Sequence, residues 1–333
     1  MSKLPAFLVS PPPSVGVEIA ADRVTAVSLT RQAGAWVVAA HGTERVAPGV
    51  VTPALNASNV HDRRALSAAL RSAFDRLGVR PRRVGLVIPD TAAKVSLLRF
   101  EKVPAASDLD QLIRWQVRKA APFRPEDAQI SWVPAAPIPG GGREYLVTMA
   151  RRDVVESYMH ACADAGAAAG IVDLASLNLI NAALVSAGSA PGTGDWLVVH
   201  VASDYATLAI VRDGQLIFFR NRASAGSGPS APGNAAPFDG DGDLADVVHQ
   251  TAMYHEDRLG GQRFAHVVLS GAAARGAEVA ERLRQVLEGR MGVRVESLDF
   301  RGTAAMRDRI GAGPELLDAL APAVGVVLRE RAA

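Results

Sequence analysis

Short runs of β-branched residues near the start of the chain predict a meander of hairpins. The runs are Val15–Ile19, Val24–Thr30 and Trp36–Thr43, and turn-forming residues separate them. Apolar residues then recur at intervals of three and four over Asp62–Leu77, which is the spacing of an amphipathic helix. Val84–Ile88 follows as a buried strand. The opening segment therefore predicts a sheet of hairpin-connected strands covered by a helix.

The middle of the chain predicts a small inserted unit. Lys94–Phe100 has strand alternation, and Ile130–Val133 and Glu144–Ala150 are expected to pair as a hairpin. A helix capped by Ser107 follows the first of these strands, and a second helix is predicted over Asp153–Ala165. The order strand, helix, strand, strand, helix favours an α+β subdomain.

The second half of the chain repeats the opening pattern. Trp196–Val201, Thr207–Val211 and Gln215–Arg220 predict another meander, and Asp213-Gly214 is a strong hairpin turn. This echo suggests a duplicated fold. A flexible loop is predicted next, over Ala223–Asp243. Helices and strands then alternate: helix Leu244–Leu259, strand Val267–Leu269, helix Ala277–Leu287, strand Val293–Leu298 and helix Glu315–Arg331. A break at Pro322 is expected in the last helix.

Composition excludes several classes of protein. The 36 basic and 34 acidic residues give a net charge of +2, which is too balanced to predict nucleic-acid binding. The single cysteine, Cys162, excludes a disulfide framework, and its apolar helical neighbours favour a buried thiol over a nucleophile. No window approaches the ~18 apolar residues that span a bilayer. Any membrane association is therefore expected to come through a partner.

Three turns are the candidate functional sites. The first contains Glu18, Ala20, Ala21 and Asp22, the second His200, Ala202 and Ser203, and the third Gly271, Ala272 and Ala273. Two hairpin-led lobes with a late glycine turn are similar to the arrangement shared by actin, sugar kinases and Hsp70. That resemblance implies an α/β, actin-like (ribonuclease H-like) two-lobed fold. It also implies hairpin turns whose N–H groups bind the phosphates of ATP and whose acidic residues hold Mg²⁺ through water.

All three turns depart from that pattern. Glu18 has one methylene too many, His200 replaces an aspartate, and Ala20, Ala202 and Ala272 add a Cβ where a nucleotide would press against the chain. We therefore expect no catalytic residue, no metal site, no hydrolysis and weak or absent ATP binding. ATP and Mg²⁺ are the expected cofactors only if the cleft is still competent. An active ATPase or small-molecule kinase on the same fold remains the alternative.

Several further segments resemble one family in order and spacing. These are Leu112–Phe123 (LIRWQVRKAAPF), Tyr158, Ala165-Gly166, Val172-Asp173, Phe219-Arg220, Val268–Gly271 and Ala323–Arg329. Together they make the chain resemble the PilM family of type IV pilus assembly proteins, which are relatives of the cell-division protein FtsA. In place of the family's Gly-Gly-Asp and helix pair, this chain has the loop 223–243, so the outer subdomain of the second lobe is expected to be reduced.

The resemblance implies a scaffold without enzymatic activity. PilM-like proteins bind the N-terminal cytoplasmic tail of the bitopic membrane protein PilN in a groove between the first lobe and the inserted subdomain. The resemblance further implies contacts with other pilus assembly proteins, a possible homo-oligomer, no nucleic-acid partner, and a cytoplasmic protein recruited to the inner face of the inner membrane. A GspL-like protein of type II secretion is a weaker alternative, because that relative continues into a membrane helix.

Five residues of the inserted subdomain are candidates for partner contact, with core packing as the competing interpretation: Leu97, Arg99, Trp115, Phe123 and Trp132. The expected division of the chain is a first lobe (1–92), the inserted subdomain (93–166), a first-lobe helix (167–190), a second lobe (191–310) and a C-terminal helix that packs back on the first lobe (311–333).

Overall fold

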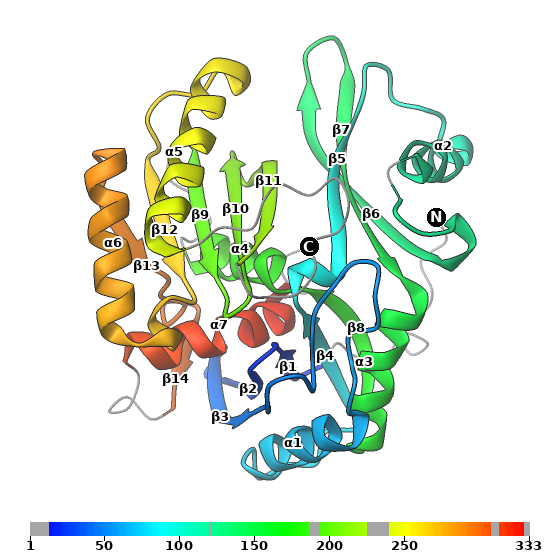
Figure 1. Ribbon diagram of the computed structural model, residues 1–333, viewed down its shortest axis with the longest axis vertical. Helices are drawn as coiled ribbons and strands as arrows, with labels where there is room; N and C mark the ends of the chain where they lie inside the picture. Colours follow the sequence, from blue (N-terminus) through cyan, green and yellow to red (C-terminus); the bar gives the residue numbers. More distant parts are fainter. Residues whose placement is uncertain (1–12, 120, 187–193, 225–239, 308–312, 330–333) are drawn as a thin grey trace.

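Two sheets with matching strand order lie at the centre of the protein (Figure 1). The computed structural model describes residues 13–119, 121–186, 194–224, 240–307 and 313–329. The first sheet has the order β14-β3-β2-β1-β4-β8 and the second the order β11-β10-β9-β12-β13. Their strands are β1 (Val15–Ile19), β2 (Arg23–Gln32), β3 (Ala35–Arg45), β4 (Arg83–Ile88), β8 (Ala168–Leu174), β9 (Trp196–Val201), β10 (Tyr205–Arg212), β11 (Gln215–Ala223), β12 (His266–Ser270), β13 (Val295–Ser297) and β14 (Ala304–Met306).

The predicted duplication is confirmed by the pairing of these strands. β1, β2 and β3 form an antiparallel meander, as do β9, β10 and β11. The first strand of each meander also pairs in parallel with the strand that follows the next helix, β4 in one lobe and β12 in the other. The hairpin turn at Asp213 and Gly214 has positive φ at both residues, 50° and 72°, as a tight turn between β10 and β11 requires.

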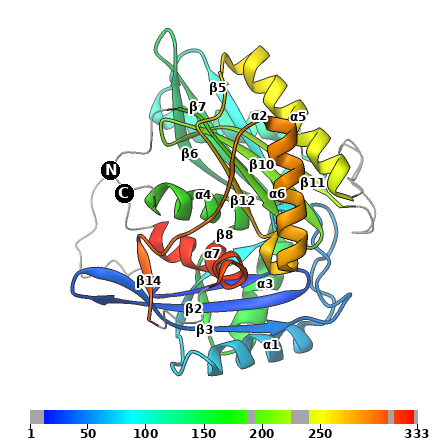
Figure 2. The ribbon, with the colours of Figure 1, turned by 90° about the vertical axis from the view of Figure 1, so that its left-hand side faces the viewer.

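Helices and sheets alternate in five layers (Figure 2). α1 and α3 cover the outer face of the first sheet, and α5 and α6 cover the outer face of the second. α4 and α7 lie between the sheets and build the largest apolar core with both of them. The helices are α1 (Arg63–Asp75), α3 (Arg152–Asp164), α4 (Ala175–Ser186), α5 (Gly240–Leu259), α6 (Ala277–Met291) and α7 (Pro314–Arg329).

Strand alternation explains how both faces of each sheet are covered. In β1, Val15, Val17 and Ile19 face the core under α1 and α3. Gly16 lies on the opposite face, where a Cβ would be 1.9 Å from the carbonyl oxygen of Ala323 on α7. The absence of a side chain at this position therefore lets α7 pack directly on the first sheet, beside the interlobe cleft.

The inserted subdomain is a three-stranded sheet with one helix against it. β5 (Ala93–Phe100), β6 (Ala128–Ile138) and β7 (Gly142–Arg151) form an antiparallel sheet of order β5-β7-β6. α2 (Ala106–Arg118) covers one face of that sheet. The core between them contains Leu109, Ile113 and Val117 from α2 and Tyr145, Val147 and Met149 from β7.

Two segments differ from the expected division of the chain. The segment 167–190, expected to be a helix, opens with the strand β8, and the helix α4 begins only at Ala175. The segment 304–306, assigned to the second lobe, is the strand β14 and pairs with β3 of the first sheet. The chain therefore crosses back to the first lobe before α7, which then packs against β1, β2 and β4.

Three local predictions also need correction. Ser107 does not cap α2, because the N-cap residue is Ala105 and the Ser107 hydroxyl bonds the Asp108 carboxylate instead. Pro322 lies inside α7 without breaking it. The loop predicted over 223–243 falls mostly outside the described residues; at its edges, β11 extends to Ala223 and α5 already begins at Gly240. None of the described helices is long and apolar enough to cross a membrane.

Candidate functional site

The two hairpin turns that face the interlobe cleft have the same backbone geometry. In the first turn, the N–H of Ala20 donates to the carbonyl oxygen of Arg23 at 2.8 Å. In the second, the N–H of Ala202 donates to the carbonyl oxygen of Tyr205 at 2.9 Å. The duplication suggested by the sequence therefore extends to the turns in which the candidate residues lie.

All three predicted turns lie close together between the two lobes, at the place predicted as the nucleotide cleft, and we keep the name cleft for it. Gly271 adopts φ +84°, and a Cβ on it would lie 2.4 Å from the carbonyl oxygen of Val201 and 3.0 Å from the ring of His200. The third turn is thus packed directly against the second. Arg23 connects the first turn to the others, because its positive charge acts on His200 and on Asp318 of α7. Of the ten predicted residues, Glu18 and His200 lie in the strands β1 and β9 just before the first two turns. The other eight lie in the three turns: Ala20, Ala21, Asp22, Ala202, Ser203, Gly271, Ala272 and Ala273.

Arg23, which sequence reasoning missed, provides the positive charge of the first turn. Its side chain is 12% exposed and lies 3.5 Å from the Glu18 carboxylate, which is 4% exposed, and 3.4 Å from Asp22. Burial raises the pKa of Glu18 above its ordinary value, and the Arg23 guanidinium opposes that shift. The first turn therefore contains a buried carboxylate and its own cation.

His200 is a neutral imidazole in the second turn. Its side chain is buried against Tyr205, with ring centroids 5.7 Å apart in an edge-to-face arrangement. Burial, reinforced by the positive charge of Arg23, lowers the pKa of His200 to about 3. At neutral pH this position therefore supplies no negative charge.

The second turn also contains an acid with unusual properties. Burial, with Asp22 and Asp90 adding negative charge nearby, raises the pKa of Asp204 to about 7. Its Oδ1 atom is buried without a hydrogen-bond partner among the described residues. Asp204 is therefore close to half-protonated at neutral pH.

The third turn is bound by an acid from α7. The Asp318 carboxylate accepts hydrogen bonds from the Ser270 hydroxyl at 3.2 Å and from the Ala273 N–H at 2.9 Å. Burial raises the pKa of Asp318, and the hydrogen bond from Ala273 opposes that shift. The Ser270 hydroxyl and the Ala273 N–H are thus already hydrogen-bonded within the protein. Sequence reasoning also missed Asp318, which lies on a different element far along the chain.

A buried hydrogen-bond network connects the two lobes beside the cleft. Asn221 donates to the Thr207 hydroxyl at 2.9 Å, and Thr207 donates to the Asp90 carboxylate at 2.6 Å. Asp90 also accepts from the N–H of Ser176 at 3.0 Å and from its hydroxyl. Because Asp90 and Ser176 belong to the first lobe and Thr207 and Asn221 to the second, this network fixes one lobe against the other.

Some polar groups of the cleft are paired with one another, whereas Glu18 Oε2, Arg23 Nε and Asp204 Oδ1 have no hydrogen-bond partner among the described residues. In the part of the chain that the structure describes, no three His, Cys, Asp or Glu side chains are arranged to hold a metal ion. Ala20, Ala202 and Ala272 are buried residues, so most of their surface contacts the protein itself. Steric exclusion of a nucleotide by their Cβ atoms stays a prediction.

The five candidate partner residues fall into different environments. Trp115 on α2 is 57% exposed, with the Lys119 ammonium 4.5 Å from its ring centroid, and the neighbouring Leu112 is 37% exposed. Phe123 and Trp132 instead pack against the core of the inserted subdomain, and the Trp132 indole donates to Asp110 at 3.1 Å. Leu97 and Arg99 lie on β5 at an edge of the sheet, where Arg99 pairs with Glu101.

A pocket that the sequence did not predict lies between the start of α1 and α3, on the outer side of the first sheet. It has a volume of about 400 Å³ and is lined by Val60, Arg63, Asp153, Glu156, Ser157 and His160. Close to it, Arg151 at the end of β7 donates to the backbone oxygen of Asn56 in the first lobe at 2.8 Å. None of the five candidate partner residues lines this pocket.

Comparisons with known proteins agree with this architecture. The profile of a family described as "Type IV pilus assembly protein PilM" matches residues 16–230. A chain from a solved PilM–PilN type IV pilus biogenesis complex is similar with a TM-score of 0.76 and 16% sequence identity, over 95% of this chain and 98% of that one. A Bacteroides thetaiotaomicron protein with an actin-like ATPase fold and unknown function has a TM-score of 0.51 and 12% identity, over 89% and 94% of the two chains. No curated protein sequence matches. The expected actin-like fold is confirmed.

Proposed function

The chain belongs to the PilM family of type IV pilus assembly proteins, and on that premise we propose that it is a non-catalytic adaptor. Its partner is the N-terminal cytoplasmic tail of a PilN-like inner-membrane protein. The observation that carries the proposal is the similarity to a chain of a PilM–PilN complex over 95% of the length. The adaptor acts in the cytoplasm, is recruited to the inner face of the inner membrane by that partner, and contacts other pilus assembly proteins or further copies of itself.

The charges in the cleft support an adaptor without a nucleotide. A Mg²⁺–ATP complex needs carboxylates free to order the metal's water ligands and N–H groups free to bind phosphate. Here Glu18 is already paired with Arg23, His200 is neutral, and Asp318 occupies the N–H of Ala273. Binding would therefore require these internal interactions to break first. The residues present do not fit Mg²⁺–ATP, and we infer that hydrolysis is absent.

One observation favours the alternative of a nucleotide-binding ATPase or small-molecule kinase. Both hairpin turns keep the same closed backbone geometry, with N–H to carbonyl distances of 2.8 and 2.9 Å at Ala20 and Ala202. A cleft with intact turns needs only a rearrangement of side chains to accept phosphates. Magnesium-dependent ATP turnover by the wild-type protein that is lost in a Glu18→Ala variant would establish this alternative.

Two surfaces are candidates for the tail of the partner. An extended peptide is bound by apolar pockets and exposed strand edges. The exposed apolar face of Leu112 and Trp115 on α2 offers the first surface. The pocket beside Ser157 offers the second; it is formed largely by α3, which the expected division placed in the segment 93–166 but which packs on the first sheet.

The adaptor role is tested with a fluorescently labelled peptide of the partner's N-terminal tail, taken from the membrane protein encoded by the neighbouring gene. We expect the anisotropy of the peptide to rise to saturation with the protein, and a scrambled peptide to show no binding. Trp115→Ser removes the exposed ring, and Ser157→Trp fills the pocket, so the variant that weakens binding identifies the surface. The absence of binding by the tail peptide would refute the proposal, and ATP turnover would favour the alternative.

A further inference from the structure

One segment of the first lobe has a large excess of positive charge. Residues 62–83 contain seven arginines and two aspartates, a net charge of +5, whereas the remaining chain has 29 basic and 32 acidic residues. The seven arginines are Arg63, Arg64, Arg71, Arg76, Arg80, Arg82 and Arg83. A protein that is almost neutral as a whole is therefore strongly polarised.

These charges lie on the outer surface. α1 buries Leu66, Leu70 and Phe74 against the first sheet, which directs its other face to solvent (Figures 1 and 2). Six of the arginines, all but Arg83, are exposed. We call this surface, formed by α1 and the loop that follows it, the arginine face.

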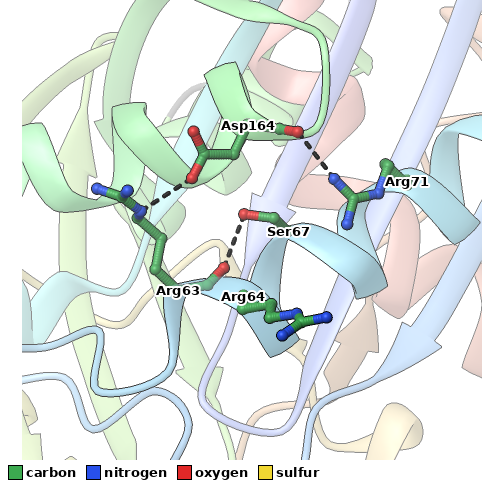
Figure 3. A pocket seen from close by; sticks show the side chains of 5 residues that line it. All are labelled: Arg63, Arg64, Ser67, Arg71 and Asp164. Atoms are coloured by element: carbon green, nitrogen blue, oxygen red, sulfur yellow. Dashed lines mark hydrogen bonds and ion pairs between the residues drawn. The ribbon is translucent and has the colours of Figure 1, made fainter.

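Only part of this charge is neutralised by neighbouring acids. Arg63 pairs with Asp164 at 2.8 Å, and Arg76 pairs with Glu44 at 2.5 Å. Arg71 donates to the backbone oxygen of Asp164 at 2.9 Å, which leaves its charge without a carboxylate (Figure 3). Arg64, Arg80 and Arg82 form no ion pair with any residue that the structure describes. Four of the six exposed arginines therefore have no carboxylate partner.

The position of two arginines opposes the stability of their own helix. Arg63 and Arg64 occupy the first turn of α1, which contains no acidic residue. The helix dipole makes this end partially positive and disfavours cations there. Asp62 caps the helix through the N–H of Ala65 and offsets one of the two charges. Asp164 neutralises Arg63, so Arg64 is the cation of this turn that has no ion pair among the described residues.

The spread of the charges indicates what kind of anion fits. Arg63, Arg64 and Arg71 line one pocket with Ser67 and Asp164 (Figure 3), but the 13 residues of α1 extend about 20 Å at a rise of ~1.5 Å per residue, so the six exposed arginines do not all converge on one phosphate group. Cations spread over this length suit a surface that presents many separate anionic groups. Val79 is the exposed large apolar residue in the segment, so contact is expected to be electrostatic and without deep insertion.

We propose that the arginine face binds an anionic phospholipid surface directly. The choice of a membrane over other polyanions rests on the proposed function, because a protein bound to the tail of an inner-membrane partner is held close to acidic headgroups. Each arginine near such a surface strengthens binding about fivefold, which corresponds to ~1 kcal/mol. The arginine face would then orient the adaptor against the membrane while the tail anchors it.

Vesicle co-sedimentation of the full chain, without the partner, tests this inference. We expect the protein to pellet with vesicles of phosphatidylglycerol and phosphatidylcholine at low salt, and not with phosphatidylcholine alone or at about 0.5 M salt. Arg64→Gln with Arg80→Gln should weaken binding roughly 30-fold, as the loss of two such charges predicts. The matched control is Arg263→Gln with Arg294→Gln, which removes two exposed charges from the second lobe and should change nothing.

Three results would overturn the inference: no pelleting with anionic vesicles at low salt, equal weakening by the control pair, or binding to a DNA duplex that is tighter than binding to the vesicles. Tail-peptide anisotropy on the same variants separates the two proposals. Peptide binding that persists without vesicle binding refutes the arginine face alone, whereas vesicle binding without peptide binding refutes the adaptor role and leaves the arginine face standing.

Discussion

Replacing Arg23 with methionine tests whether the cleft is held together by its internal ion pair. Methionine keeps an unbranched apolar side chain but removes the charge that lies 3.5 Å from the Glu18 carboxylate. Both side chains are largely buried, and removing one partner of a buried pair typically costs about 3–5 kcal/mol. The lower end of that range is expected here, because Glu18 has a way to relieve the loss.

The relief is protonation of Glu18. Its ordinary pKa is 4.5, and burial already raises the pKa in the folded protein. Without Arg23, the folded state accommodates Glu18 as the neutral acid. At pH 7 the protonation of a group with that ordinary pKa costs about 3 kcal/mol, at ~1.4 kcal/mol per pH unit, and at pH 5 it costs less than ~1 kcal/mol. The destabilisation by Arg23→Met should therefore be about 3 kcal/mol at pH 7 and fall below ~1 kcal/mol at pH 5.

Urea unfolding followed by far-ultraviolet circular dichroism measures this difference. The double variant Glu18→Gln with Arg23→Met serves as the control, because it removes both charges and should recover most of the lost stability at pH 7. A single variant that loses less than ~1 kcal/mol at pH 7 would refute the reasoning. A double variant as unstable as the single one would show that Arg23 acts through another group.

Three further predictions concern separate parts of the molecule. Asp204→Asn should raise the free energy of unfolding at pH 8 by up to about 4 kcal/mol and leave it unchanged below pH 4. The reason is that the pKa of Asp204 is raised to about 7 from an ordinary 3.8, so its ionisation destabilises the folded protein as pH rises between those values. Urea unfolding at several pH values measures the difference. Gly16→Ala should lower the free energy of unfolding by more than ~3 kcal/mol in the same assay, because the new Cβ would lie 1.9 Å from a carbonyl oxygen of α7. Gly289→Ala in α6 is the control: no atom lies within 4 Å of its new Cβ, so it should stabilise the protein by up to ~1 kcal/mol. Trp115→Ser should change stability by less than ~0.5 kcal/mol, but Trp132→Ser should lower the melting temperature through loss of core packing; equal effects would contradict the assigned environments.

The strands of the two duplicated meanders could be predicted from the sequence alone, because the signals that define these strands are local. Strand alternation and the Asp213-Gly214 turn define β10 and β11 without reference to the rest of the chain. β8 was missed because its sequence, AAGIVDL, begins with small residues and lies between two helices. β14 has only three residues and gains its partner, β3, from a distant part of the chain. Pro322 stays helical because α7 is buried between the sheets, where tertiary packing outweighs the lost hydrogen bond.

The candidate site was predicted only in part for a similar reason. The resemblance to the actin-like arrangement located Glu18, His200 and Gly271, since the first two lie at the end of the strand that opens each meander and the third follows the late strand. It did not reveal that Arg23 neutralises Glu18, a contact within the first hairpin, or that Asp318 binds the third turn, which depends on how α7 packs against that turn in space. Aligning the two hairpins would have drawn attention to Arg23, which occupies the position of Tyr205 in the second.

Calorimetric titration of the purified protein with Mg²⁺–ATP tests the central claim most directly. That claim is that Arg23 neutralises Glu18 and that Asp318 binds the third turn, so a nucleotide would have to displace the protein's own interactions to bind. The account predicts no heat beyond dilution and no release of phosphate. Saturable heat with hydrolysis, and a crystal grown with ATP in which a metal-bound triphosphate lies ordered between the lobes with Arg23 displaced, would contradict it.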